Sequence, residues 1–327
     1  MSTRGFFICG CLVSVLCEFA GSRRLVGAAP GNWQLNNQAP RVATAGRSPA
    51  TIIDKTPAEL LQAMPELAGL EPAASQELPP EILENVGAKV ESYFRNVVST
   101  SAREETIQEQ IGLNGEVRET LKQAFRYLVI AHPEKGPLDF EEYRTDKENL
   151  TAGGHVRSDI LLTEGFVYVP IYLHPIYQDD SDFNYVGQQT VEGHKCYVVA
   201  FAQIPEFARL RARFTEDFKP YEIMLQGIGW IDVSSFQIIR MYLEPLPGPT
   251  PEGTIQPKFV DRLGSVKQYT TEVTYSEVRF KGIDVVFWLP REAVVNLDFG
   301  DREIKYRNHH RYSDYRLYTS QTKLVFR

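Results

Sequence analysis

Apolar residues recur at helical spacing in two stretches near the N-terminus of the chain. The first follows Thr56-Pro57-Ala58-Glu59, which combines an N-cap threonine, a proline at the first helical position and a capping-box glutamate. It predicts a short helix that ends near Gly69. The second stretch begins after Pro79-Pro80 and keeps its apolar period as far as Val97. It predicts an amphipathic helix whose apolar stripe must pack against another element.

Most of the remaining chain alternates between apolar and polar residues or forms short apolar runs, which favours strands. Short turns between consecutive strands favour antiparallel pairing. We therefore expect an α+β fold that is mainly β. Its large, curved antiparallel sheet would form an unclosed β-barrel with helices covering the concave face. The predicted strands are 101–111, 125–131, 138–144, 194–204, 269–280, 283–289, 293–299, 302–307 and 312–326.

One segment within the β region has helical spacing instead. Residues 205–220 place Phe207, Leu210, Phe214 and Phe218 on one stripe, which predicts a helical insertion.

The segment GIGWIDVSSFQIIRMYLE, residues 227–244, predicts a β-hairpin. Because directly opposed residues share a face, its two apolar faces pair only across a loop with an odd number of residues. A three-residue loop places Arg240 opposite Trp230, whereas a five-residue loop places it opposite Asp232. The first register predicts a cation–π contact and the second an ion pair. Asp232 is also a candidate to cap the turn.

Composition and charge narrow the class of protein. The chain has 327 residues, 43% of them hydrophobic, which is enough for a sizeable core. Its formal net charge of -7 argues against a nucleic-acid binder, because phosphate contacts need a basic surface.

The first residues have the pattern of an export signal. Arg4 precedes an apolar run, 5–20, that is too short for a good membrane span, and the small residues Val26-Gly27-Ala28 offer a cleavage site after Ala28. We expect a periplasmic or secreted protein, peripheral to a membrane at most. The two arginines at 23–24 leave a retained N-terminal anchor as the alternative. Three of the four cysteines lie in this signal, so Cys196 alone remains and no internal disulfide can form.

These observations predict four regions: a signal peptide at 1–28, a flexible linker at 29–55, N-terminal helices at 56–100, and an antiparallel β domain at 101–327 with the helical insertion at about 205–220.

The chain carries no recognisable catalytic or metal-binding motif. His309 and His310 are adjacent on a predicted strand and would point to opposite faces. Residues 180–184 resemble the start of a calcium loop, but Tyr185 stands where a glycine is needed and Val191 where a glutamate is needed. We expect no catalytic residue, metal or cofactor, and a protein that is not an enzyme; a hydrolase of unknown type is the least favoured alternative.

Aromatic residues are the remaining chemical signal, with 16 Tyr and 18 Phe. They fit either a large core or an apolar cavity between sheet and helices that holds an acyl chain. The candidate cavity residues are Trp230, Arg240, Tyr242, Phe207, Phe214, Phe218, Tyr168 and Tyr172.

Four segments of the chain resemble known proteins: GHKCYVVAF, GIGWIDVSSFQIIRMYLE, TTEVTYSEVRFKGIDVVFWLP and YRNHHRYSDYRLYTSQTKLVF. They resemble uncharacterised exported proteins of acidobacterial type and, more distantly, outer-membrane lipoprotein-sorting proteins of the LolA/LolB type. The resemblance covers roughly residues 100–326. It implies an unclosed barrel that binds acyl chains beneath mobile helices, and it carries over no specific ligand residue.

The preferred functional interpretation is therefore binding of a lipid, acyl chain or lipoprotein segment on the concave face. The alternative is a protein–protein interaction or envelope-stress sensor domain that uses a sheet edge. A continuous apolar cavity favours the first interpretation, and a filled core with an exposed apolar patch favours the second. The sequence fixes no oligomeric state.

Overall fold

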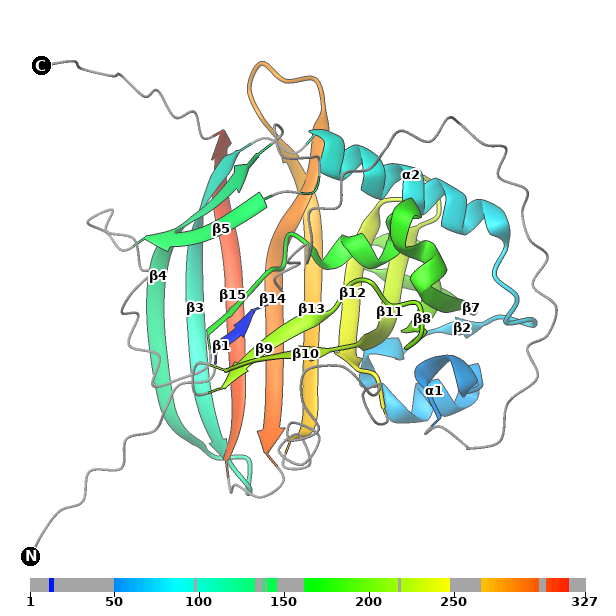
Figure 1. Cartoon of the computed structure of the whole chain (residues 1–327), viewed down its shortest axis with the longest axis horizontal. Coiled ribbons are helices and arrows are strands. Elements are labelled where there is room, and N and C mark those ends of the chain that lie inside the picture. The colour runs from blue at the N-terminus through cyan, green and yellow to red at the C-terminus, as the bar shows by residue number, and fades with distance from the viewer. Residues whose placement is uncertain are drawn as a thin grey trace, which may run out of the picture.

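Figure 1 shows the computed structural model of the chain. It describes residues 12–14, 50–96, 99–132, 138, 140–145, 162–216, 219–247, 266–299 and 304–317. The rest of the predicted signal and linker, the residues between the predicted strands 293–299 and 302–307, and Phe218 lie outside the described residues. Within the described chain, no helix is long and apolar enough to cross a membrane.

One open antiparallel sheet of 11 strands organises the fold (Figure 1), which confirms the predicted α+β class and curved sheet. Strand β15, near the C-terminus, pairs with β3, so the two ends of the β region meet inside the sheet rather than at its edges. In spatial order the strands are β2 (Glu71–Pro72), β7 (Ser181–Val191), β8 (His194–Gln203), β11 (Leu225–Asp232), β12 (Ile238–Pro245), β13 (Val266–Arg279), β14 (Val286–Phe299), β15 (Ile304–Leu317), β3 (Thr100–Gly112), β4 (Val117–Ala131) and β5 (Phe140–Thr145).

Two pairs of predicted strands are in fact single long strands. Strand β14 continues through Pro290, where the alternation predicts a break between 283–289 and 293–299. A register shift between Thr274 and Tyr275 accompanies the proline, because a bulge absorbs a residue that cannot donate to the ladder. Strand β15 likewise runs without a break across the gap predicted between 307 and 312.

A second, four-stranded sheet has the order β10-β9-β1-β6. Its strands are β10 (Lys219–Ile223), β9 (Ala212–Glu216), β1 (Leu12–Ser14) and β6 (Leu162–Glu164). Strand β1 comes from the run predicted to be the signal core.

The helix predicted for 205–220 is wrong, because β9 and β10 form an antiparallel hairpin that overlaps the second half of this range. The aromatic spacing fits both periods over so short a segment. Pro220 and the aromatic and β-branched residues disfavour a helix interior, and pairing with a neighbouring strand decides the outcome.

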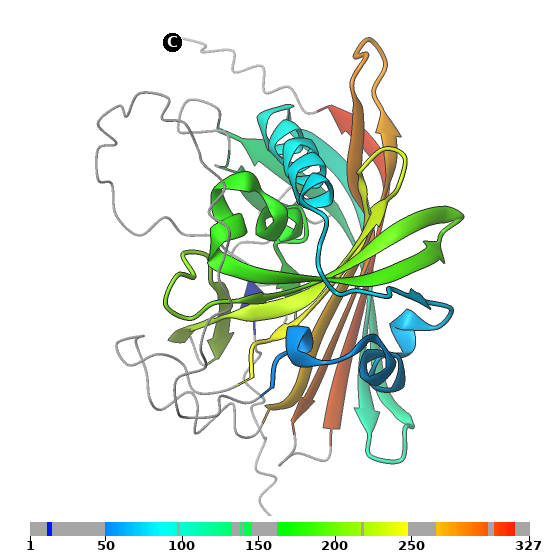
Figure 2. The ribbon, with the colours of Figure 1, turned by 90° about the vertical axis from the view of Figure 1, so that its right-hand side faces the viewer.

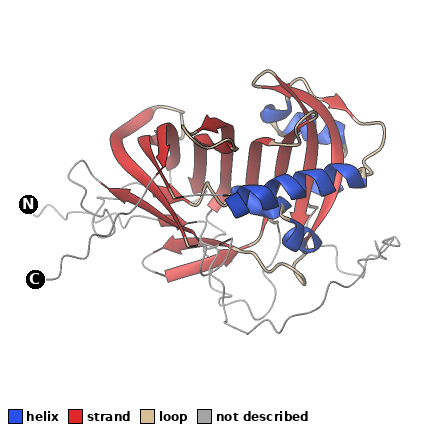
Figure 3. Ribbon diagram, turned by 90° about the horizontal axis from the view of Figure 1, so that it is seen from above, coloured by secondary structure: helices blue, strands red, loops and turns tan. Residues whose placement is uncertain are grey.

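Helices cover the concave face of the large sheet, as predicted (Figure 3). They are α2 (Pro80–Asn96) and the 3₁₀ helices η3 (Val169–Leu173) and η4 (Pro175–Asp180). Together with the inward side chains of β8 and β11–β14 they form the largest hydrophobic cluster of the described chain.

The opposite face of the sheet carries its own cover, which the sequence does not predict (Figure 2). Helix α1 (Pro57–Ala63), with η1 (Ile52–Asp54) and η2 (Pro65–Leu67), packs on β7, β8, β11 and β12. Leu60 and Leu67 are fully buried there, in the same hydrophobic cluster as Trp230. The α1 helix ends before the predicted Gly69 because Pro65 cannot continue it. The two N-terminal helices therefore cover opposite faces.

The hairpin of β11 and β12 resolves the open question of register. Trp230 lies opposite Arg240, and the Arg240 guanidinium carbon is 4.8 Å from the centre of the indole ring. A bulge after Trp230 then places Ile231 opposite Ile238, so the register is not continuous. Asp232 caps the turn, since its Oδ1 accepts hydrogen bonds from the backbone N–H of Ser234 (3.0 Å) and Ser235 (2.7 Å).

Candidate functional site

Helix α2 is seated on the concave side by a single apolar stripe. Ile82, Val86, Val90 and Phe94 are spaced four residues apart, so they lie on one face of the helix, and all four are buried. Pro80 begins the helix, where its missing N–H costs nothing. The helix thus presents an apolar underside to the sheet and a polar surface to solvent.

Polar contacts between α2 and the layer beneath it are few. Among the described residues, two hydrogen bonds join the helix to other elements. Gln178 Nε2 of η4 donates to the Leu83 carbonyl at 3.0 Å, and Tyr93 OH donates to the Val167 carbonyl at 3.3 Å. Gln178 Nε2 also reaches the Leu173 carbonyl at 3.0 Å. Apolar contact therefore accounts for most of the attachment of α2.

Gly87 lets the backbone of α2 approach η4 closely. A Cβ at this position would lie 2.5 Å from Gln178 Nε2 and 3.1 Å from Pro175 Cγ. The glutamine amide is the end of a flexible side chain and can move, whereas the proline ring cannot. The spacing between α2 and η4 thus depends on the absence of a side chain at this residue.

A crevice opens beside α2, between the helix and the ends of β12, β13 and β14. Its volume is about 20 Å³, which is room for about one water molecule. Apolar and aromatic groups dominate the lining, and Lys89 stands at the exposed edge. The space beside α2 is therefore too small for an acyl chain in this structure. The lining residues are Lys89, Val90, Tyr93, Pro170, Gln237, Ile238, Tyr275 and Trp288.

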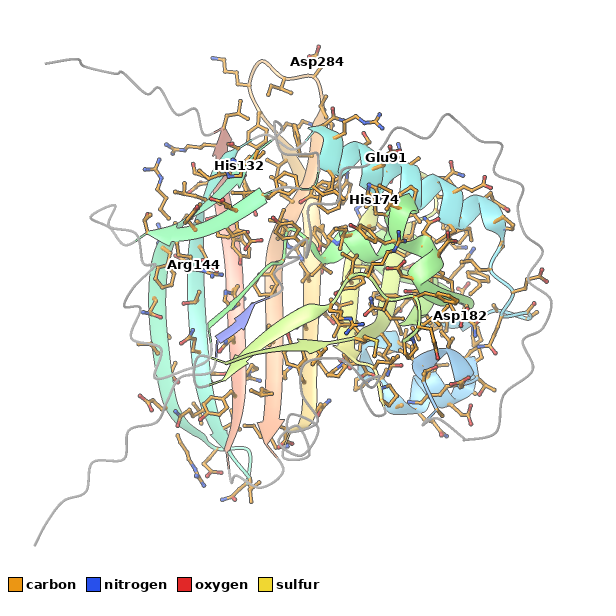
Figure 4. The ribbon with its side chains drawn as sticks, viewed as in Figure 1. Glu91, His132, Arg144, His174, Asp182 and Asp284 are labelled. Atoms are coloured by element: carbon orange, nitrogen blue, oxygen red, sulfur yellow. The ribbon has the colours of Figure 1, made fainter. Side chains whose placement is uncertain are left out.

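His174 lies beneath α2, at the junction of η3 and η4 (Figure 4). Its ring packs 6.0 Å from that of Phe94 and 6.1 Å from that of Tyr177. Its Nδ1 accepts a hydrogen bond from the Ile176 N–H at 3.2 Å, which places the remaining proton on Nε2. Burial lowers the pKa of His174, and the charges of Glu91 and Arg95 on α2 act in opposite directions. The neutral imidazole is the form that fits under the helix.

The segment that precedes η3 fills the middle of the concave face. The backbone carbonyl of Phe166 accepts a hydrogen bond from Tyr275 OH at 3.1 Å, and the Gly165 N–H donates to Glu142 Oε2 at 2.9 Å. Tyr168 OH donates to the carbonyl of Phe140 on β5. This segment separates an apolar half of the concave face, under α2, from a polar half over β15, β3 and β4.

A buried ionic network lies in the polar half. Glu104 on β3 is 0% exposed, and Arg144 on β5 is 7% exposed. The Arg144 guanidinium donates to both carboxylate oxygens of Glu104, at 2.5 and 2.8 Å. His310 Nδ1 and Tyr312 OH, both on β15, lie 2.8 and 2.9 Å from Glu104 Oε1. One carboxylate thus joins strands β3, β5 and β15.

The protonation states of this network follow from its contacts. Burial alone raises the pKa of Glu104, but the Arg144 charge and the hydrogen bonds from His310 and Arg144 outweigh it and lower that pKa to about 2. Burial lowers the pKa of His310, although its hydrogen bond to Glu104 opposes the change. The network therefore holds an ionised glutamate, a charged arginine and a neutral histidine whose Nδ1 carries the proton.

Two of the eight candidate cavity residues lie on the concave side. Tyr168 and Tyr172 are buried in or next to η3, and the Tyr172 ring stacks on that of Phe201 at 5.6 Å. Both belong to the filled core beneath α2.

Three more lie on the opposite face, under the N-terminal cover. Trp230 is fully buried, and its Nε1 donates to Gln189 Oε1 at 2.7 Å. Tyr242 OH donates to Glu244 Oε2 at 2.9 Å. Arg240 stacks on Trp230 and pairs with Glu272 at 3.6 Å. The structure therefore separates these residues from Tyr168 and Tyr172 by the thickness of the sheet.

Of the three candidate phenylalanines, the structure describes the exposure of Phe207 alone. Phe207 is 52% exposed in a turn, Phe214 lies on β9, and Phe218 lies outside the described residues. The eight candidates thus do not form one cavity.

The sequence misses the parts of the site that depend on distant contacts. The amphipathic stripe of α2 is visible in the sequence, and it identifies the helix. Gln178 and Gly87, which set how closely the helix is held, have no local signal. The same is true of Glu104, because its partners Arg144 and His310 are far away along the chain.

Comparison with known proteins gives no family. No protein-family model matches the sequence, and no curated protein matches it. In structure, the chain is similar to a domain described as an outer-membrane lipoprotein-sorting protein from Vibrio parahaemolyticus, at 10% identity and a TM-score of 0.35, over 75% of this chain and 95% of that one. It is also similar to a DUF1329 family protein from Desulfovibrio piger ATCC 29098, at 10% identity and a TM-score of 0.36, over 76% and 96% of the two chains. At these scores the two likenesses decide neither ligand nor activity.

Proposed function

We propose that this chain is an exported, non-enzymatic protein that binds an acyl chain, free or attached to a lipid or lipoprotein, between α2 and the concave face of the sheet. The observation that carries the proposal is the seating of α2. The apolar face of α2 rests on η3, η4 and the concave side of the sheet, and among the described residues two hydrogen bonds join it to them, beside a small crevice. Displacement of α2 would expose the largely apolar surface beneath it, which is the kind of surface that an acyl chain needs.

The free energy gained by burying the apolar stripe of α2 is comparable with that gained by burying an acyl chain in its place. Burial of the four stripe residues of α2 contributes about 1.5–3 kcal/mol each, or about 6–12 kcal/mol in all. Each methylene of an acyl chain contributes about 0.8 kcal/mol when buried, so about ten methylenes recover about 8 kcal/mol. An acyl chain can therefore replace the contacts that α2 gives up.

The export signal predicted at 1–28 supports this role, because a lipid carrier of the cell envelope has to leave the cytoplasm. Cleavage after Ala28, which would remove β1 from the four-stranded sheet, and a periplasmic or secreted location are part of the proposal. The tethered alternative, with the N-terminal segment retained, would place the same site near a membrane.

The alternative interaction role has weaker support. The exposed large apolar side chains of the described residues come from separate elements and include Leu113, Ile176, Phe207 and Val285. Single exposed apolar residues are normal on a protein surface. One sheet edge is also closed by the short strand β2, which carries Pro72. We therefore favour acyl-chain binding.

A reversible disulfide between α2 and η4 tests the proposal. Gly87 and Pro175 are the positions of choice, since a Cβ on Gly87 lies 3.1 Å from Pro175 Cγ, one bond from Pro175 Cβ. This spacing is close to that of a disulfide, whose Cβ atoms are about 3.5–4.5 Å apart. The double variant is made with Cys196→Ala, which removes the buried native thiol. Displacement of a fluorescent fatty acid is measured for the oxidised and reduced forms.

The reduced form is the control, because it shares every substitution with the oxidised form. We expect the reduced form to bind the probe and the oxidised form to lose most of that binding. Equal binding by both forms would place the ligand elsewhere. An absence of probe binding by the unsubstituted protein, together with an absence of lipid in its organic extract, would remove the carrier function.

A further inference from the structure

The convex face of the sheet carries a polar pocket that lies away from α2 and its crevice. Its volume is about 440 Å³, within the usual range for small-ligand sites. Three neighbouring strands, β4, β3 and β15, form it. The lining residues are Glu105, Thr106, Ile107, Lys122, Gln123, Ala124, His309 and Arg311.

Strand register explains how the pocket is built. In one row Glu105 lies between Ala124 and Arg311, and in the next row Ile107 lies between Lys122 and His309. Successive residues of a strand point to opposite faces, so residues two apart on each strand share the convex face. Ala124 is the short side chain that leaves space among longer neighbours.

The carboxylates in and beside the pocket do not neutralise all of its positively charged side chains. Glu105, its one carboxylate, is already paired with Arg103 at 2.6 Å. Glu292, on β14 beside the pocket, accepts from His309, and it lies 3.9 Å from Arg311. In the described part of the chain, no ion pair engages Lys122, which is exposed.

The next row along the sheet adds further positive charge. Arg103 and Arg126 lie opposite each other there, on the same face as Glu105. Lys122 and Arg311 thus line the pocket, and Arg103 and Arg126 lie in the row next to it. Positively charged side chains are therefore concentrated on this part of the sheet, although the chain as a whole has a net charge of -7.

We propose that this pocket binds a phosphate group, with Lys122 and Arg311 as its charged ligands. Arginine offers paired donors to phosphate oxygens, and lysine supplies a point charge. Arg311 is held only weakly by Glu292, so it can turn toward an anion without breaking a short ion pair. The phosphate can be a free ion or the headgroup of an anionic phospholipid, and the two sources share the same chemistry.

The test compares two double variants on the same face. Lys122→Gln with Arg311→Gln removes the two proposed ligands. Lys305→Gln with Arg307→Gln is the matched control, because it removes two positive charges from the same face of β15. Lys305 and Arg307 are already paired, with Asp298 at 2.9 Å and Glu109 at 2.6 Å. Thermal unfolding of each variant checks that the fold is kept.

Two probes distinguish the sources of phosphate. Inorganic phosphate is titrated while the Ile107 methyl resonance is followed, and binding to vesicles of phosphatidylglycerol is compared with binding to vesicles of phosphatidylcholine. We expect the Lys122/Arg311 variant to bind about tenfold more weakly or worse, and the control to bind as the original protein does. A response to phosphate indicates a free-ion site, and a response to phosphatidylglycerol alone indicates a headgroup site.

Equal losses in both double variants would overturn the proposal, because they would show a general effect of charge. Failure of the unsubstituted protein to respond to either probe would also overturn it. Neither result bears on acyl-chain binding under α2, which is measured with the fluorescent fatty acid and the disulfide variant.

Discussion

The buried pair of Glu104 and Arg144 should be among the most costly positions of the fold to disturb. We predict that Glu104→Gln strongly destabilises the chain at neutral pH. The substitution keeps the shape of the side chain and its ability to accept hydrogen bonds. It removes the negative charge, so the guanidinium of Arg144 stays buried without a counter-ion.

The magnitude follows from the burial of both partners. Removal of one member of a buried ion pair costs about 3–5 kcal/mol. The pKa of Glu104 gives a second value, since a shift from 4.5 to about 2 corresponds to about 3 kcal/mol. The two routes agree in order of magnitude. A loss of this size is a large part of the 5–15 kcal/mol typical of a folded protein.

Urea unfolding at pH 7, followed by tryptophan fluorescence and circular dichroism, measures the loss. Glu105→Gln is the matched control, because it is the next residue on β3, faces the other side and is paired on the surface with Arg103. It should cost about 1 kcal/mol or less. Glu104→Gln combined with Arg144→Met should recover much of the stability, because no unpaired charge then remains.

The pH dependence of the free energy of unfolding is an independent test of whether ionised Glu104 stabilises the fold. The pKa of Glu104 is lower in the folded chain than in the unfolded chain, so its contribution is complete above about pH 4.5 and is lost as the pH falls toward 2. In Glu104→Gln this part of the slope should be missing. If Glu104→Gln costs no more than Glu105→Gln at pH 7 and leaves the acid slope unchanged, the ionised buried pair is not what stabilises this half of the sheet.

Three further predictions concern the two covers of the sheet. Gly87→Val should destabilise the chain by about 1–3 kcal/mol and speed fatty-acid association, whereas Ala88→Val on the exposed side should do neither, as measured by stopped-flow fluorescence. Leu67→Ala should cost about 2–5 kcal/mol in urea unfolding and make the chain around η2 sensitive to limited proteolysis. Because burial lowers the pKa of His174, stability should fall as the pH drops below about 6.5, and His174→Asn, which can still cap η4, should reduce that slope.

The sequence predicts best those elements whose signal is local. The stripe of α2 and the alternation of most strands are periodic over many residues, so the large sheet and its covering helix follow from the pattern. The parity of the β11–β12 hairpin correctly offers Trp230 opposite Arg240 as one of two pairings, but the odd-numbered loop is wrong, because the last pair, Ile231 and Ile238, is separated by residues 232–237, an even number. It cannot supply the bulge after Trp230, because a bulge shifts the parity on which the inference rests.

Other features depend on contacts that no local pattern contains. The segment 205–220 is short enough to fit either period, and its strand pairing decides the structure. Residue type alone groups the aromatic candidates together, but Trp230 and Tyr172 lie on opposite sides of one sheet. Which face a side chain occupies depends on register across several strands, and that information is spread over the whole chain.

The same strands carry two covers, and the difference between the covers indicates which one can move. On the convex side, sheet amides bind the backbone of the N-terminal cover. Gln226 Oε1 accepts from the Ile52 N–H, Asn184 Nδ2 donates to the Ile53 carbonyl, and Gln189 Nε2 donates to two carbonyls at 66 and 68. Helix α2 has two hydrogen bonds to other described elements, and neither comes from a strand. Apolar contacts re-form with any apolar partner, whereas a buried amide that loses its carbonyl is left unsatisfied. The convex cover is therefore the more firmly held of the two, and under the proposed function α2 is the element that an acyl chain would displace.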